Sequence, residues 1–205
     1  MNSEDVQDYE RQCDSKLNQE SRTIMMMYER ERNFFIIHTS SFIILIMVLP
    51  ILTGADNPML RAKAKNVGDI NKELKSLVKD MEETMTKADG VGLAAPQVGK
   101  SIRLCIARIE DTVTILINPV ITKRSDKKVI DQEGCLSLPG VWVDVARACD
   151  IQLTYSDLKG KTQERQLSGF SARVVQHEID HLNGILIVDH ANVTMQPTTT
   201  QPTES

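Results

Sequence analysis

The sequence predicts an α+β fold, and three observations lead to that prediction. With 41% hydrophobic and 25% charged residues, the composition is that of a globular protein, which excludes a wholly disordered or polytopic membrane chain. Short β-branched runs separated by turn residues are typical of strands, and they lie between two segments with helical spacing. Because strands and helices are grouped rather than strictly alternating, the pattern argues against a doubly wound parallel sheet.

The first helical segment runs from Ile70 to Met85, with Asp69 as its expected N-cap and an end at Asp89-Gly90, where the glycine can adopt a left-handed conformation. Its apolar residues recur at intervals of three, four and seven, so they share one face. The second segment runs from Phe170 to Leu182 and ends at Asn183-Gly184. We expect strands at 102–108, 112–117, 120–123, 151–155 and 163–167, with a hairpin turn at 157–160 between the last two.

The chain is expected to divide into an arm over 1–46, a folded domain over 47–190 and a Thr/Pro-rich tail over 191–205. We expect the arm and the tail to be disordered or, for the arm, not native structure. The hydrophobic run over 34–52 is borderline for a membrane span of about 20 residues, because polar residues and Pro50 interrupt it. It is therefore either a membrane anchor or, in part, the first strand of the core. The arm lacks the features of a secretory signal or a transit peptide, which argues against export.

Charge and cysteine usage exclude further classes of protein. The net charge is −4, whereas a domain that bound nucleic acid through its whole surface would be basic. The four cysteines are too sparse for a disulfide framework, which indicates a reducing compartment. We expect Cys105 and Cys149 to be small buried hydrophobic residues.

The segment from Gln176 to His181 contains H-E-x-x-H inside the second expected helix. Four residues advance a helix by about 400°, so His177 and His181 lie on one face, one turn apart, and can share a metal ion. Glu178 cannot easily join them as a ligand, which leaves it free to handle a proton on water. In a chain of this composition the motif arises by chance about once in 200 sequences. The alternative is two half-buried histidines satisfied by hydrogen bonds.

An open catalytic metal site needs a third protein ligand and a free position for water. Downstream of His181, only Asp189, His190 and Glu204 offer one, and no later helix is expected to position them. Upstream, Cys135 lies between a glycine and a turn-like Ser-Leu-Pro-Gly stretch, where the backbone can be exposed and tightly bent. The alternative for Cys135 is again a small buried hydrophobic residue.

Three segments resemble, in order and separation, the motifs of the bacterial-type peptide deformylases. They are Gly90-Val-Gly92-Leu-Ala-Ala-Pro-Gln97-Val-Gly99, Glu133-Gly-Cys135-Leu-Ser137 and Gln176-His177-Glu178-Ile-Asp-His181. The resemblance runs from about Met47 to about Asp189. It implies antiparallel sheets packed around a central helix that carries H-E-x-x-H. It also implies hydrolysis of the N-formyl group from the N-terminal methionine of newly made proteins, with release of formate.

The resemblance implies one metal ion per chain, bound by Cys135, His177 and His181. By ligand type and affinity order, two imidazoles and a thiolate suit zinc, whereas the family implies Fe²⁺, for which Zn²⁺ or another divalent metal can substitute. Glu133 and Arg147 are expected to form a buried ion pair that supports the Cys135 loop.

The resemblance also implies the catalytic roles. Glu178 is the general acid/base, and the Gln97 side chain and the Leu136 N–H stabilise the oxyanion, while Gly92 helps to hold the substrate backbone. The pocket for the methionine side chain should be apolar, and its candidate lining residues are Val91, Phe170 and Val174.

The implied partners are N-formylmethionyl nascent chains and, transiently, the ribosome, in a cytoplasmic location without DNA or stable membrane association. The family usually begins near Met47, so we expect the 46 preceding residues to be dispensable. Many members carry a C-terminal helix, whereas this chain ends in a Thr/Pro tail. Two competing hypotheses are a catalytically decayed homologue that serves as a binding module and a peptidase anchored through 34–52. The first gains no support, because every chemistry-bearing position is present.

Overall fold

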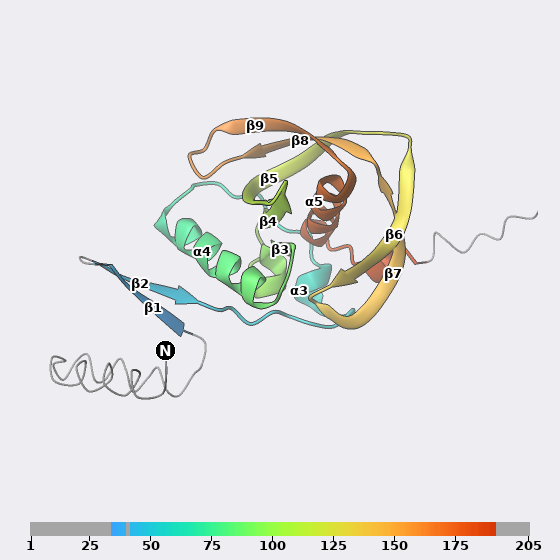
Figure 1. Cartoon of the computed structure of the whole chain (residues 1–205). Coiled ribbons are helices and arrows are strands. Elements are labelled where there is room, and N and C mark those ends of the chain that lie inside the picture. The colour runs from blue at the N-terminus through green and yellow to red at the C-terminus, as the bar shows by residue number, and fades with distance from the viewer. Residues whose placement is uncertain (1–33, 40–41, 192–205) are drawn as a thin grey trace, which may run out of the picture. The chain divides into compact units, whose positions relative to one another are not determined.

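The structure is a computed structural model that describes residues 34–39 and 42–191 (Figure 1). It contains two compact units, Met1–Met47 and Val48–Ser205. In the first unit, strand β1 (Phe34–Thr39) pairs antiparallel with β2 (Phe42–Met47), with Phe34 opposite Met47. Residues 1–33 and 192–205, which hold most of the expected arm and tail, lie outside the described residues. No helix within the described ranges is long and apolar enough to cross a membrane.

Over residues 48–191, the second unit contains two antiparallel sheets and three α-helices. The larger sheet has the order β3-β4-β5-β8-β9, and β6 pairs with β7 in a separate two-stranded sheet. The strands are β3 (Gly92–Ala94), β4 (Leu104–Ile109), β5 (Thr112–Arg124), β6 (Lys128–Cys135), β7 (Leu138–Ala148), β8 (Asp150–Ser156) and β9 (Thr162–Ser168). The helices are α3 (Pro58–Arg61), α4 (Lys72–Lys87) and α5 (Gly169–Leu182), with 3₁₀ turns η1 (Ala95–Val98) and η2 (Ile187–Asp189).

Helix α5 lies inside the unit, between the larger sheet and the β6–β7 pair (Figure 1). Its apolar face, which includes Val175 and Ile179, packs with Cys105 of β4 and Leu153 of β8 in one buried cluster. Asn183 is its C-cap, and Gly184 has φ 76°, as expected from Asn183-Gly184. The predicted α+β fold with antiparallel sheets around a central helix is therefore confirmed.

Helix α4 buries the predicted apolar stripe, but both of its ends differ from the prediction. Asn71, not Asp69, is the N-cap, because its Oδ1 accepts a hydrogen bond from the Leu74 N–H at 2.9 Å. At the other end Asp89, not Gly90, takes the left-handed conformation with φ 53°, which a short polar side chain tolerates. Gly90 has a different role, since a Cβ there would lie 2.9 Å from the Leu136 side chain.

The predicted strands are present, but two of them are joined into one. Segments 112–117 and 120–123 form the single strand β5, whose pairing with β8 shifts at Asn118-Pro119. Asn118 has φ 51°, and its side-chain amide pairs with both backbone groups of Val67 in place of a neighbouring strand. The hairpin turn at 157–160 is confirmed, because the Asp157 N–H bonds the Lys161 carbonyl at 3.0 Å. Strands β3, β6 and β7 were not predicted, because their alternation is weak or interrupted by glycine.

The run over 34–52 was expected to supply, in part, the first strand of the core, but it forms no strand of the second unit beyond Met47. Residues 48–54 have no regular structure, although Leu49 and Ile51 pack against the core beside α4. Their backbone bonds go to non-strand partners: the Leu49 N–H donates to Thr84 Oγ1, and the Leu52 N–H donates to the Gln97 carbonyl. Pro50 has no N–H, so it would also interrupt a strand ladder here.

Candidate active site

Three elements meet at one cavity of about 480 Å³, which is within the range of small-ligand pockets. The end of β6 contributes Cys135, the turn that follows it contributes Leu136, and α5 contributes His177 and Glu178. The segment from β3 to η1 contributes Gly92 and Gln97. Residues that are far apart in the sequence therefore line one cavity.

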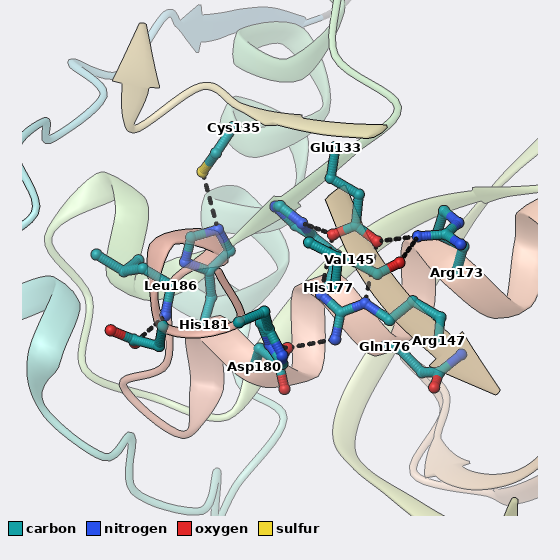
Figure 2. Close-up of polar contacts among 12 residues, drawn as sticks. Glu133, Cys135, Val145, Arg147, Arg173, Gln176, His177, Asp180, His181 and Leu186 are labelled. Carbon is teal, nitrogen blue, oxygen red and sulfur yellow. Dashed lines mark hydrogen bonds and ion pairs between the residues drawn. The ribbon is translucent and has the colours of Figure 1, made fainter. Parts of the chain in front are cut away.

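Cys135, His177 and His181 could hold a metal ion, because one ligand atom from each lies within 4.8 Å of the others. Cys135 Sγ is 3.2 Å from His181 Nε2, and the two imidazole rings are edge to face with centroids 4.9 Å apart (Figure 2). Helical spacing places the two rings one turn apart, as the motif predicted. The β6–β7 turn then brings the thiol to the same point.

The two histidines have opposite protonation preferences. Burial, together with the neighbouring His177, lowers the pKa of His181 to about 3, so this ring is neutral, as a metal ligand must be. Burial also opposes protonation of His177. Its hydrogen bonds to Cys135 and Glu133 outweigh this effect and raise its pKa to about 10. A divalent cation would therefore compete with a proton at His177.

Glu133 fixes the orientation of the His177 ring by a hydrogen bond at Nδ1 (Figure 2). Its Oε2 is 3.1 Å from His177 Nδ1, which leaves Nε2 of that ring to face the candidate metal position. Arg147 holds the same carboxylate with two bonds of 3.0 and 2.9 Å, so the predicted buried ion pair is confirmed. Arg173 adds a third bond of 2.7 Å. Although burial alone would raise the pKa of Glu133, the bonds from His177 and Arg147 hold it well below its ordinary value.

The guanidinium groups also join the surrounding elements. Arg173 on α5 donates to the backbone carbonyls of Val129 in β6 and Val145 in β7. Arg147 on β7 pairs with Asp180 on α5, which in turn is bonded to His190. The β6–β7 pair that carries Cys135 is therefore tied to the helix that carries both histidines.

The downstream residues considered as third ligands have other partners. Asp189 pairs with Arg61 and accepts a bond from the Leu186 N–H, and His190 bonds Asp180. Glu204 lies outside the described residues. A metal site completed from downstream, as in an H-E-x-x-H peptidase, has no support among these contacts.

Glu178 is buried beside the candidate ligands and lies against Gly92. A Cβ at Gly92 would overlap the carboxylate, with Glu178 Cδ only 2.7 Å away. Glu178 Oε2 has no hydrogen-bond partner in the described part of the chain. Burial raises the pKa of this group to about 7, despite the opposing charge of His177. A carboxyl group with that pKa can both accept and return a proton near neutral pH.

The Gln97 side chain is held in one orientation from both ends. Its Oε1 accepts a bond of 2.8 Å from the Ala94 N–H, and its Nε2 donates to Ser137 Oγ at 3.1 Å. The same nitrogen lies 3.8 Å from Cys135 Sγ. The amide is 2% exposed, and its N–H groups are directed toward the Cys135 side of the cavity.

The four predicted substrate-binding residues, Val91, Gly92, Phe170 and Val174, all line the cavity. They differ in burial, because Val174 is 5% exposed whereas Val91 and Phe170 are 41% and 61% exposed. Val174 thus belongs to the floor of the cavity, and the other two side chains lie at its mouth.

Three residues of the site were given no role from the sequence: Arg173, Ser137 and Asp180. Arg173 precedes His177 by one helical turn and therefore lies on the same face of α5, which was an available signal. Ser137 belongs to a turn and to one of the three motifs, but neither pattern indicates its hydrogen bond to Gln97. Asp180 lies inside the H-E-x-x-H motif, but its partners come from β7 and from beyond η2.

The family model described as Polypeptide deformylase matches residues 48–196. The chain belongs to the peptide deformylase family. The function of this family is the hydrolysis of N-formyl groups from peptides. All of the catalytic and ligand candidates lie inside the matched range.

Individual relatives agree with this assignment. A peptide deformylase from Dictyoglomus thermophilum is 50% identical over 135 residues, covering 66% of this chain and 88% of that protein. The crystal structure of peptide deformylase from Thermotoga maritima superposes with a TM-score of 0.68 at 41% identity, covering 70% of this chain and 97% of that one. A Met-Ala-Ser-bound class I type b peptide deformylase from Acinetobacter baumannii has a TM-score of 0.67 at 36% identity, covering 70% and 98%.

Proposed function

We propose that this deformylase is metal-dependent, with one divalent cation bound by Cys135, His177 and His181. The observation that carries the proposal is the convergence of these three ligand atoms within 4.8 Å, beside a buried carboxylate with an unpartnered oxygen. Two imidazoles and a thiolate match the three-ligand sets of catalytic cations, which leave one position open for water or substrate. When bound, such a cation supplies Lewis acidity, which lowers the pKa of water and polarises a carbonyl oxygen.

Glu178 acts as the general acid/base. Its pKa of about 7 lets it take a proton from the attacking water and return that proton to the departing amine. The substrate is the N-formyl group of an N-terminal methionine, and the products are formate and a free amino terminus. Gly92 leaves room for the Glu178 carboxylate and, having no side chain, also permits close approach of the substrate backbone.

Gln97 and the Leu136 N–H stabilise the negative charge that develops on the formyl oxygen. The bonds from Ala94 and to Ser137 fix the Gln97 amide before the substrate arrives, so little reorganisation is needed in the transition state. Leu136 lies in the β6–β7 turn next to Cys135, on the same side of the cavity. Val91, Phe170 and Val174 form the apolar surroundings of the methionine side chain.

We assign Fe²⁺ as the physiological metal, with Zn²⁺ or another divalent ion able to substitute. A thiolate and two imidazoles suit either ion. We further propose a cytoplasmic enzyme that meets N-formylmethionyl nascent chains and contacts the ribosome only transiently. The folded domain spans 47–190.

The test is formate release from a formyl-Met peptide by protein purified anaerobically, with metal analysis of the same sample. We expect one equivalent of a divalent metal per chain and loss of activity on chelation. Cys135→Ser should lose metal and activity, because a hydroxyl is a poor soft ligand. Cys149→Ser is the matched control, since this thiol lies outside the ligand group. If Cys135→Ser retains full metal occupancy and turnover, the proposed ligand set is wrong.

A further inference from the structure

His190 lies directly after η2, outside the group of candidate ligands and outside the lining of the cavity. Its Nε2 is 2.8 Å from Asp180 Oδ2. Because a carboxylate only accepts hydrogen bonds, the imidazole donates this one. Asp180 belongs to α5 and directly precedes His181. His190 therefore contacts the helix that carries both histidine ligands, without being a ligand itself.

The same oxygen of Asp180 also accepts a hydrogen bond from Arg147 Nη1, so His190 and Arg147 share one carboxylate. Arg147 donates from its other two nitrogens, Nε and Nη2, to the carboxylate of Glu133 at 3.0 and 2.9 Å. The guanidinium thus lies between two carboxylates (Figure 2), and each of its three nitrogens has a carboxylate partner. A planar group that is held on two edges keeps a single orientation.

These contacts continue to a candidate metal ligand, because Glu133 Oε2 is 3.1 Å from His177 Nδ1. An unbroken series of polar contacts therefore joins His190, Asp180, Arg147, Glu133 and His177. The side chains of His190 and Asp180 are 28% and 19% exposed, whereas those of Arg147 and Glu133 are each 6% exposed. Asp180 is thus the more exposed of the two carboxylates. Without His190, it is free to turn toward water and away from Arg147.

The turn that carries His190 is itself fixed to the core. Leu186 and Ile187 are 1% and 2% exposed and pack in one buried cluster with Leu60 and with Val145 of β7. The His190 N–H donates to the Ile187 carbonyl at 3.0 Å, which sets the backbone from which the imidazole extends. The imidazole is therefore presented by a buried turn packed on the same strand that carries the guanidinium.

We propose that His190 is a positioning residue for the metal site. By holding Asp180 against Arg147, it limits the movement of the guanidinium. Glu133 then stays in the orientation that fixes the His177 ring for metal binding. This inference rests on the proposed function, because it assumes a cation at the three candidate ligands. Direct partners of metal ligands change metal affinity by about 10- to 100-fold, and His190 acts through three intervening side chains, so we expect a smaller effect of about two- to tenfold.

Release of Zn²⁺ tests this role without turnover, because Zn²⁺ has no redox chemistry of its own. The natural protein and its variants are loaded with Zn²⁺ and mixed with an excess of a colorimetric chelator. We expect release to be about two- to tenfold faster in His190→Ala. Release should return close to the natural rate in His190→Gln, whose side-chain amide can donate to the same carboxylate. If the glutamine variant releases Zn²⁺ as fast as the alanine variant, the hydrogen bond is not the cause and the proposal is overturned.

Val188→Ala is the matched control, because Val188 belongs to the same turn and packs against the same buried cluster but is not a polar partner of Asp180. It should release Zn²⁺ at the natural rate. Equal acceleration in Val188→Ala and His190→Ala would assign the effect to loosening of η2 and would overturn the proposal.

A double-mutant cycle shows whether His190 acts through Asp180. In an Asp180→Asn background, adding His190→Ala should change the release rate by less than about twofold, because the carboxylate that the imidazole holds is already gone. The same fold-change in both backgrounds would overturn the proposal. Zn²⁺ binding by the natural protein with an unchanged release rate in His190→Ala overturns only this inference, whereas no Zn²⁺ binding by the natural protein overturns the proposed function.

Discussion

Two buried glutamates on either side of His177 have opposite surroundings. Glu133 is 6% exposed and interacts with Arg147, Arg173 and His177, and its pKa is held well below the ordinary value. Glu178 is 3% exposed, one of its oxygens has no partner among the described residues, and its pKa is raised to about 7. Burial opposes ionisation of both carboxyl groups, so the opposite pKa shifts come from the hydrogen-bond donors that surround Glu133 and are missing at Glu178.

The difference shows how one residue type serves two purposes in the same site. A carboxylate surrounded by guanidinium groups stays charged and is suited to orienting an imidazole. A carboxylate that burial leaves without donors keeps a proton affinity near neutral pH and is suited to proton transfer. Different elements form the environments of the two glutamates. Strand β7 and helix α5 supply the hydrogen-bond donors to Glu133, whereas Gly92 of β3, which has no side chain, leaves room for the Glu178 carboxylate.

The largest effect is expected when Glu178 loses its ability to accept a proton. Glu178→Gln keeps the shape of the side chain, and we expect formate release to fall by at least about 10²-fold while the metal is retained. Glu164→Gln, on the exposed face of β9, is the control. Steady-state formate assays with metal analysis check the prediction. Normal turnover in Glu178→Gln would show that Glu178 does not transfer the proton, so the two glutamates would not differ in function as described above.

The second-largest loss of activity is expected when a side chain at position 92 fills the space that the Glu178 carboxylate occupies. In Gly92→Ala the new Cβ must displace the Glu178 carboxylate, and a misplacement of about 1 Å can cost on the order of 10²-fold in rate. Gly68→Ala should have little effect, because nothing lies within 4 Å of a Cβ there. We expect kcat to fall in the first variant only. Equal activity in both would mean that the position of Glu178 is not critical.

Removing the charge of Glu133 should affect stability and metal binding more than proton transfer. Glu133→Gln leaves Arg147 and Arg173 without their shared carboxylate, and breaking a buried pair costs about 3–5 kcal/mol. Loss of the correct His177 orientation should weaken metal affinity by about 10- to 100-fold. Urea denaturation and competition with a metal chelator measure the two effects. Unchanged values in both would show that the Glu133 network is not required.

The smallest effect is expected in the pH dependence of stability, measured on cation-free protein. The folded-state pKa of Glu178, about 7, is above its ordinary value of 4.5, so its stabilising contribution is complete below pH 4.5 and is lost as the pH rises through 7. Glu133 has the opposite sign: its contribution is present above pH 4.5 and is lost as the pH falls.

The free energy of unfolding of the natural protein, minus that of Glu178→Gln, should therefore decrease between pH 4.5 and 7. The same difference taken against Glu133→Gln should not decrease over that range. If the two differences follow the same pH dependence, the two carboxyl groups do not have the distinct environments described above.

Much of the fold followed from local patterns. The stripe of α4, the bounds of α5 and the turn at 157–160 depend on spacing and on turn residues, which act over a few positions. The missed elements depend on distant partners. Strand β3 is three residues long and exists through its pairing with β4, and β6 carries exposed residues on both faces.

The sequence by itself determined the pair of histidines and the glutamate between them, because helical geometry fixes their relative positions within α5. It also determined, through the resemblance, that Cys135 and Gln97 belong to the same site. The pair of Glu133 with Arg147 was also predicted, but only the tertiary structure added Arg173 and His177 to the surroundings of Glu133 and decided those of Glu178. Whether a buried carboxylate meets Arg147 and Arg173 or the bare backbone of Gly92 depends on how strands and helices from distant segments pack, and that packing sets each pKa.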